Sequence, residues 1–123
     1  MKYRQLNDIG AYKIAFDVSN YAWPIVTKWP YLAQQTLGIQ FLRALDSISE
    51  NVAEGFGRWG KKDRIRFYRY SFGSLYEALS QNEKAGRRGL FTEQQYMYTR
   101  TELQKLPREL NALIKYTNEV LTF

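Results

Sequence analysis

The chain has 123 residues, a formal net charge of +6, and neither cysteine nor histidine. The lack of cysteine excludes disulfides, thiolate metal sites and thiol nucleophiles, and the lack of histidine removes the commonest general base and metal ligand. We therefore expect no enzyme activity, no cofactor and no bound metal. No run approaches the ~20 apolar residues of a membrane span, and no apolar signal segment is seen at the N-terminus. These features predict a single-domain cytoplasmic protein that does not enter a membrane.

The first predicted helix covers about residues 8–28. Apolar side chains recur there at alternating spacings of three and four residues, which indicates one helical seam. Its members are Ile9, Tyr12, Phe16, Ser19, Trp23 and Val26. Pro24 interrupts the last turn, so we expect this helix to kink or end early.

The second predicted helix covers about residues 32–54. Its seam consists of Phe41, Leu45, Ile48 and Val52. Gly55 follows at the position where a left-handed C-terminal cap favours glycine. We therefore predict that the helix ends at this glycine.

The third predicted helix covers about residues 61–85 and the fourth about residues 92–121. Thr92 and Gln95 have the spacing of a capping box at the start of the fourth helix. Pro107 lies within its seam and should bend the helix, because proline supplies no backbone donor. The two seams are Ile65, Tyr68, Phe72, Leu75 and Leu79, then Leu103, Leu106, Leu110, Leu113, Thr117 and Val120.

No segment shows the period-two alternation of a strand, so we expect an all-α protein without a sheet. Four amphipathic helices joined by short turns predict one domain over 1–123, an antiparallel up-down-up-down four-helix bundle. Aromatic residues make up 16% of the chain. This is more than the four seams use, so we expect the remaining rings to lie at a homo-oligomer interface.

The loop from Gly55 to Gly60 matches the GxGxxG dinucleotide fingerprint. That fingerprint functions after a strand, within a βαβ unit. Here a predicted helix precedes it. We therefore interpret the loop as a glycine-rich turn between helices.

The segment from Arg58 to Arg69 concentrates positive charge. It carries six basic residues and one acid, Asp63, and therefore +5 of the net +6. At ~100° per residue, Lys62, Arg66 and Arg69 share one stripe opposite the apolar seam, beside a helix N-terminus that favours anions. This pattern is either a solvated face or a nucleic-acid-binding surface. The candidate contacts are Arg58, Lys61, Lys62, Arg64, Arg66 and Arg69.

A polar stripe follows one side of the second predicted helix. We interpret it as a buried hydrogen-bond network that sets the register of the helices, with Glu77 of the next helix as partner of Arg43. A diiron site is excluded because bundles of that kind use Glu-x-x-His pairs. The stripe consists of Gln40, Arg43, Ser47, Asn51 and Glu54.

The same residues resemble the signature of a known family. The matching block contains Gln40, Arg43-Ala44, Ser47-Ile48, Asn51, Ala53-Glu54-Gly55 and Gly57-Arg58. A second block contains Phe67, Gly73-Ser74-Leu75 and Glu77, and Trp29-Pro30 stands where members tend to have Phe-Pro. Both blocks are similar to those of the S23 proteins, first noticed as reading frames in intervening sequences of bacterial large-subunit ribosomal RNA genes. Gly60 departs from the serine usual before the third helix.

The resemblance implies an up-down bundle that forms a homo-oligomer, commonly a pentameric ring. One related branch, the accessory proteins of diversity-generating retroelements, partners a reverse transcriptase and nucleic acid. We therefore expect the chain to bind itself, and RNA, DNA or a nucleic-acid enzyme such as a reverse transcriptase. The alternative is a protein–protein adaptor whose surface rings, such as Tyr96 and Tyr98, make the contact.

Overall fold

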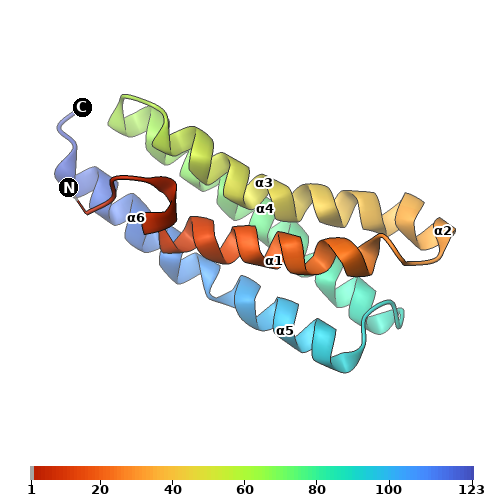
Figure 1. The fold of residues 1–123 in the computed structure, drawn as a ribbon. Helices are drawn as coiled ribbons and strands as arrows, with labels where there is room; N and C mark the ends of the chain where they lie inside the picture. The colour runs from red at the N-terminus through yellow and green to blue at the C-terminus, as the bar shows by residue number, and fades with distance from the viewer. Residues whose placement is uncertain (1) are drawn as a thin grey trace.

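The computed structural model describes residues 2–123, and the regular elements in this part of the chain are all helices, without a strand. Four rods form a bundle, and successive rods run in opposite directions along it (Figure 1). The all-helical four-helix bundle that the seams predict is therefore confirmed. The elements are the short η1 (Leu6–Asp8), α1 (Gly10–Val26), α2 (Tyr31–Ala33), η2 (Gln34–Gly38), α3 (Ile39–Phe56), α4 (Lys61–Arg87), α5 (Glu93–Gln104) and α6 (Leu106–Val120).

The second rod is built from three consecutive elements, because α2 leads through the π-helical turn η2 into α3. Gly38 lies at the end of η2, and a Cβ there would stand 3.0 Å from Cγ1 of Val26 on α1. The side-chain amide of Gln34 donates to the carbonyl oxygens of Thr27 and Trp29, each at 2.7 Å. These contacts hold the turn between α1 and the second rod in place.

The fourth rod is divided into α5 and α6. The capping box at Thr92 forms as the sequence predicts, with Gln95 N donating to Thr92 Oγ1 at 3.1 Å and Thr92 N donating to Gln95 Oε1 at 2.9 Å. The break lies at Lys105, and Pro107 occupies the first turn of α6. Proline is tolerated in a first turn because the backbone donors there have no helical partner.

The core lies along α3 and α6. The four seam residues of α3, from Phe41 to Val52, are fully buried. Leu103, Leu106 and Leu110 are buried in the same way on the fourth rod, and Tyr68 and Leu75 contribute from α4. The seams of these helices therefore point inward, apart from Val120, which is exposed at the end of α6.

The predicted seam of α1 is wrong at Phe16 and Trp23. Phe16 is 48% exposed and Trp23 is 56% exposed. The buried face carries small side chains in their place, because alanines allow the backbone of α1 to approach α3 closely. The buried residues of α1 are Ala11, Ala15, Val18, Ser19, Ala22 and Val26.

Candidate nucleic-acid interface

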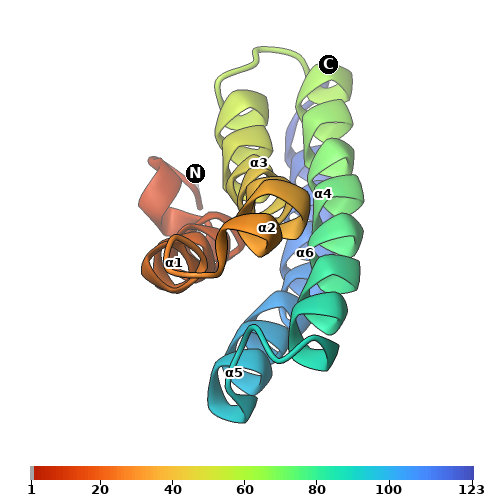
Figure 2. The same cartoon turned by 90° about the vertical axis from the view of Figure 1, so that its right-hand side faces the viewer.

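Lys62, Arg66 and Arg69 lie on the outer face of α4. All three are exposed, whereas Tyr68 and Leu75 of the same helix are buried. At ~100° per residue the two sets lie on opposite sides of the helix. Figure 2 shows α4 at the edge of the bundle, on the side away from α1. The predicted stripe is therefore accessible along this helix.

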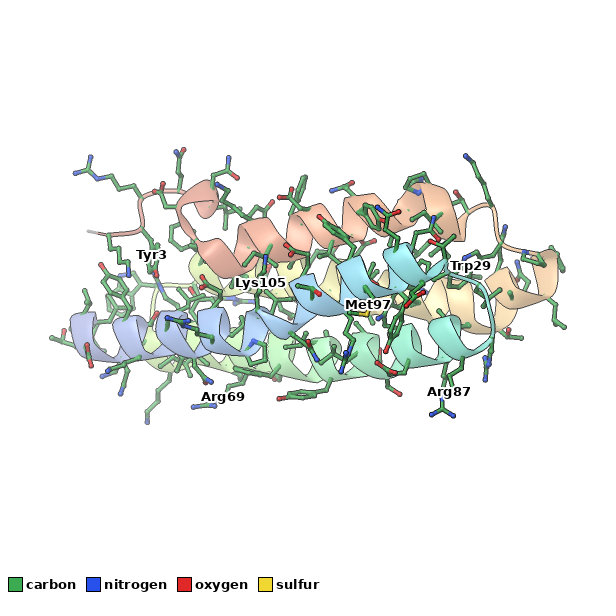
Figure 3. The ribbon with its side chains drawn as sticks, turned by 90° about the horizontal axis from the view of Figure 1, so that it is seen from below. Tyr3, Trp29, Arg69, Arg87, Met97 and Lys105 are labelled. Carbon is green, nitrogen blue, oxygen red and sulfur yellow. The ribbon has the colours of Figure 1, made fainter. Side chains whose placement is uncertain are left out.

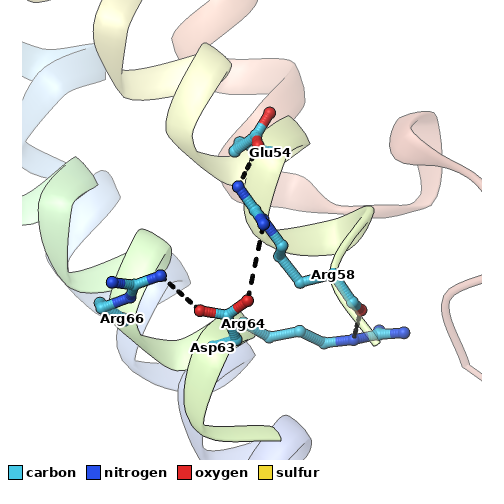
Figure 4. A network of polar contacts seen from close by, with 5 residues as sticks. All are labelled: Glu54, Arg58, Asp63, Arg64 and Arg66. Carbon is cyan, nitrogen blue, oxygen red and sulfur yellow. Dashed lines mark hydrogen bonds and ion pairs between the residues drawn. The ribbon is translucent and has the colours of Figure 1, made fainter. Parts of the chain in front are cut away.

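A small ion-pair network lies beside the stripe, where α3 turns into α4 (Figure 4). Arg58 Nη2 lies 2.7 Å from Glu54 Oε1, and Arg58 Nη1 lies 3.7 Å from Asp63 Oδ2. Arg66 pairs with the other oxygen of Asp63. With Glu54 included, six basic residues face two carboxylates, so the cluster retains a net charge of +4.

Two more of the six candidate residues, Arg64 and Lys61, contact backbone carbonyl oxygens. Arg64 Nε donates to the backbone oxygen of Arg58 at 2.6 Å and so bridges the loop to α4. Lys61 Nζ lies 3.5 Å from the backbone oxygen of Asn118 on α6. Both side chains are half-buried. They are thus less available to a ligand than the exposed stripe.

The first backbone donor of α4 is also occupied. Gly60, the N-cap residue, offers no side-chain acceptor, and Lys61 N donates to the backbone oxygen of Phe123 at 2.8 Å. The ring of Phe123 stacks on Trp59 with centroids 4.7 Å apart. The predicted attraction of anions to this helix start is therefore reduced, because the chain's own carbonyl takes the first donor.

The ring of Phe67 lies close to two guanidinium groups. The Arg58 Cζ atom stands 4.7 Å from its ring centroid, and the Arg66 Cζ atom stands 5.1 Å from it. Such cation–π contacts order the arginine side chains without neutralising them. Among residues 2–123, Lys62 and Arg69 have no ion-pair partner within 4.0 Å.

The glycine-rich loop follows a helix rather than a strand, as the sequence predicts, and Gly55 is not a left-handed cap. α3 continues through Gly55 to Phe56, and Gly57 ends it with a φ of −79°. Gly55 is buried instead, and a Cβ there would lie 2.7 Å from Cε1 of Tyr68. Burial raises the pKa of Tyr68 to about 12, so its phenol stays protonated in this contact. The glycine is required by close helix packing, which periodicity does not reveal.

The polar stripe of α3 is half-buried at its centre, at Ser47 and Asn51, and exposed elsewhere. Asn51 Nδ2 donates to Ser47 Oγ at 2.9 Å, and Ser74 Oγ of α4 donates to the same oxygen at 2.9 Å. These three side chains join α3 to α4. The prediction of a buried network is wrong for Gln40, Arg43 and Glu54, which are exposed.

Arg43 and Glu77 do not form the predicted ion pair. Within the described chain no oxygen of Glu77 lies within 4.0 Å of a basic nitrogen. Both side chains line a shallow groove with Gln40, Ser80 and Lys84. They remain apart because each stays solvated, and an exposed pair gains little from contact.

Two buried hydrogen bonds between helices are not predicted by any sequence motif. Ser71 Oγ donates to the backbone oxygen of Ile48 at 2.9 Å, and Thr99 Oγ1 donates to Asn82 Oδ1 at 2.6 Å. Ser71, Asn82 and Thr99 are fully buried. Only their positions on the inner faces of α4 and α5 could have indicated these hydrogen bonds, because no sequence motif connects the residues.

The described residues contain no group of three or more carboxylates placed to hold a metal ion. Within residues 2–123 no helix is both long and apolar enough to span a bilayer.

Comparison with known proteins supports the assignment suggested by the two sequence blocks. The profile of the 23S rRNA-intervening sequence protein family matches residues 7–112. The crystal structure of a protein of unknown function from the S23 ribosomal protein family of Bacteroides thetaiotaomicron VPI-5482 superposes with a TM-score of 0.74. The two chains are 17% identical, and the match covers 85% of this chain and 98% of that one, which shows a shared fold. A search of curated proteins found no match. The protein belongs to the 23S rRNA-intervening sequence protein family.

Proposed function

We propose that this protein is a non-enzymatic, homo-oligomeric scaffold that binds nucleic acid, or a nucleoprotein partner, through the exposed face of α4. The observation that carries the proposal is the line of Lys62, Arg66 and Arg69, all exposed and spaced by four and three residues. Lys62 and Arg69 have no carboxylate partner within the described chain. Basic side chains arranged in this way neutralise phosphates and release their counterions.

Removal of these three charges tests whether the exposed face of α4 binds nucleic acid. The variant Lys62→Gln/Arg66→Gln/Arg69→Gln keeps good helix formers at all three positions. On duplex DNA, the slope of log K against log salt should flatten by about 2.7, because each lost phosphate contact contributes about 0.9. Fluorescence anisotropy titrations at several salt concentrations measure this slope.

A matched control removes three charges from the other side of the bundle. Arg4, Lys13 and Lys28 are exposed residues in or near α1. Their replacement by glutamine changes the net charge equally and should leave the slope nearly unchanged. If both triple variants weaken binding equally, the stripe on α4 is not the binding surface.

The proposal that the protein is a homo-oligomer is supported by exposed apolar side chains on α1 and at the start of the second rod. Trp23, Ile39 and Leu42 line an apolar groove of about 360 Å³ between α1 and the second rod. Tyr31 and Leu32, 77% and 73% exposed, lie at the start of that rod. Large contiguous apolar surfaces of this kind mark interaction sites. We propose that copies of the chain meet here, most simply in the pentameric ring that the family resemblance implies.

Sedimentation equilibrium tests this contact. The wild type should have about five times the 14.6 kDa chain mass. Trp23→Glu should reduce the mass towards that of one chain, because a carboxylate cannot be buried in an apolar contact without a partner. Tyr76→Glu, at an exposed ring on α4, is the control and should leave the mass unchanged. A wild type that sediments as one chain at micromolar concentration excludes the ring.

The adaptor is the alternative function. Tyr96 is unsuited to such a contact, since it is half-buried and its hydroxyl donates to Glu83 at 2.7 Å. Tyr98 packs on Tyr21 with centroids 4.3 Å apart and is 40% exposed. If the wild type does not bind RNA or DNA at low salt, the adaptor function is favoured. The exposed surface around Trp23 would then be the site that contacts another protein.

A further inference from the structure

The exposed face that carries Lys62, Arg66 and Arg69 continues along the whole length of α4. Exposed residues follow one another every three or four positions from the first turn to the last. At ~100° per residue they stay within a band about 80° wide. We call this band the α4 spine, and it consists of Lys62, Arg66, Arg69, Gly73, Tyr76, Ser80, Lys84 and Arg87.

Both ends of the α4 spine are basic. Lys84 and Arg87 have no ion-pair partner within 4.0 Å among the described residues. Figure 3 shows Arg69 and Arg87 projecting from α4 towards the same side of the molecule. Glu83 lies beside this end but is engaged elsewhere, with Tyr96 at 2.7 Å and Arg100 at 3.7 Å. The spine itself contains five basic residues and no carboxylate.

Cations near a helix C-terminus also offset the helix dipole, which by itself accounts for Lys84 and Arg87 as stabilising residues. That role does not require them to share one narrow face with Lys62, Arg66 and Arg69. Stabilisation of the helix dipole also gives no role to the uncharged residues between the two basic ends of the spine.

The centre of the α4 spine is uncharged and open. The ring of Tyr76 is 59% exposed. A Cβ at Gly73, one turn earlier, would meet no atom within 4 Å, so bare backbone lies beside the ring. A base has room here to stack flat on the tyrosine, and such stacking is tolerant of sequence because every base has a π-face.

We propose that the α4 spine holds one single strand of nucleic acid, with phosphates at its two basic ends and a base stacked on Tyr76. This inference rests on the proposed function. It adds that the nucleic acid is single-stranded and that Lys84 and Arg87 form a second cluster of phosphate contacts. A paired base in a duplex keeps its face covered by its neighbours and is not free to stack on the ring. The spine runs for about 37 Å at 1.5 Å per residue. It is therefore long enough for a strand of about 11 nucleotides at a stacked rise of 3.4 Å.

The second basic cluster is tested with oligothymidylates of 4 and 16 nucleotides. The wild type should bind the longer strand more tightly and with a steeper salt dependence, because only that strand reaches both ends. The variant Lys84→Gln/Arg87→Gln should flatten the salt slope on the 16-mer by about 1.4, at about 0.7 per phosphate contact. The control Lys13→Gln/Lys28→Gln removes two exposed charges in and after α1 and should leave the slope unchanged.

The stacking contact is tested with Tyr76→Leu. Loss of the ring should weaken binding of the 16-mer about fivefold or more and leave binding of a 16-base-pair duplex unchanged. Phe16→Leu is the matched control, because it removes another exposed ring, on α1 at the side of the bundle away from α4. Circular dichroism confirms that each variant keeps the helicity of the wild type.

The outcomes separate this inference from the proposed function. If neither strand nor duplex binds at low salt, both fail. A second outcome is that Lys62→Gln/Arg66→Gln/Arg69→Gln loses binding, whereas Lys84→Gln/Arg87→Gln and Tyr76→Leu bind as the wild type does. In that case the proposed function stands, but the single-strand inference is overturned. A duplex bound more tightly than the 16-mer overturns it as well.

Discussion

The ring of Tyr68 on α4 packs directly on the backbone of Gly55 on α3, with no room for a side chain between the two helices. A Cβ at Gly55 would lie 2.7 Å from Cε1 of Tyr68 and 2.9 Å from the backbone oxygen of Arg64. Both residues are buried. The turn into the basic face of α4 therefore depends on a glycine that the conformation of the backbone does not itself require.

Gly55→Ala should lower the free energy of unfolding by about 1–3 kcal/mol, the usual cost of an added carbon in a packed interior. Urea denaturation followed by circular dichroism measures the change. Gly57→Ala is the control, because a Cβ there would lie 3.6 Å from its nearest neighbour, an ordinary contact. A Gly55→Ala protein as stable as the wild type would show that the two helices separate easily here.

Gly73→Ala should have the opposite effect. Gly73 lies in the interior of α4 with open space around the position of a Cβ. Glycine in a helix interior is less stable than alanine by about 0.5–1 kcal/mol. The variant should therefore unfold at a higher urea concentration than the wild type. A decrease in stability would mean that an atom outside the chain, such as one of a second copy, occupies the space.

Thr99→Val should destabilise the contact between α4 and α5 by about 1–3 kcal/mol, because it leaves a buried acceptor without its donor. That acceptor is Asn82 Oδ1, which receives the Thr99 hydroxyl at 2.6 Å. Thr101→Val changes an exposed residue of the same helix and serves as the control. Equal unfolding midpoints for the two variants would contradict the role given to this hydrogen bond.

Asp8 should make the stability of the N-terminal segment depend on pH. Its Oδ2 accepts hydrogen bonds from the backbone nitrogens of Arg4 at 2.9 Å and Gln5 at 3.0 Å. These bonds, first that from Arg4 and then that from Gln5, lower the pKa of the carboxyl below its ordinary value of 3.8. A lowered pKa in the folded state stabilises the protein above the unfolded value, and this stabilisation is lost as the pH falls through the folded value.

Asp8→Asn should therefore melt at a lower temperature than the wild type at pH 7, and the difference should shrink as the pH falls below 3.8. Thermal unfolding curves over this pH range measure it. Asp17→Asn, at an exposed position of α1, is the control. A difference between Asp8→Asn and the wild type that does not change with pH would contradict the linkage.

Periodicity predicted the inner faces of α3 and α6 correctly because large aliphatic side chains there recur at helical spacing and fill the core. It failed on α1, where the same spacing selects Phe16 and Trp23 although both are exposed. The buried face of α1 consists mainly of alanine, valine and serine. A prediction from periodicity assigns the largest apolar side chains to the core. In the folded protein, the distance between two helices decides how large a side chain can fit between them.

The sequence by itself determined the helical class, the capping box at Thr92 and the placement of Lys62, Arg66 and Arg69 on one face of a helix. These are local properties, set by spacings of three and four residues along one element. Only the tertiary structure decided that Asp63 pairs with Arg66, that Arg64 turns back to the loop and that Gly55 receives the ring of Tyr68. Such contacts depend on how close two helices lie and at which register they meet, and packing of the whole bundle sets both.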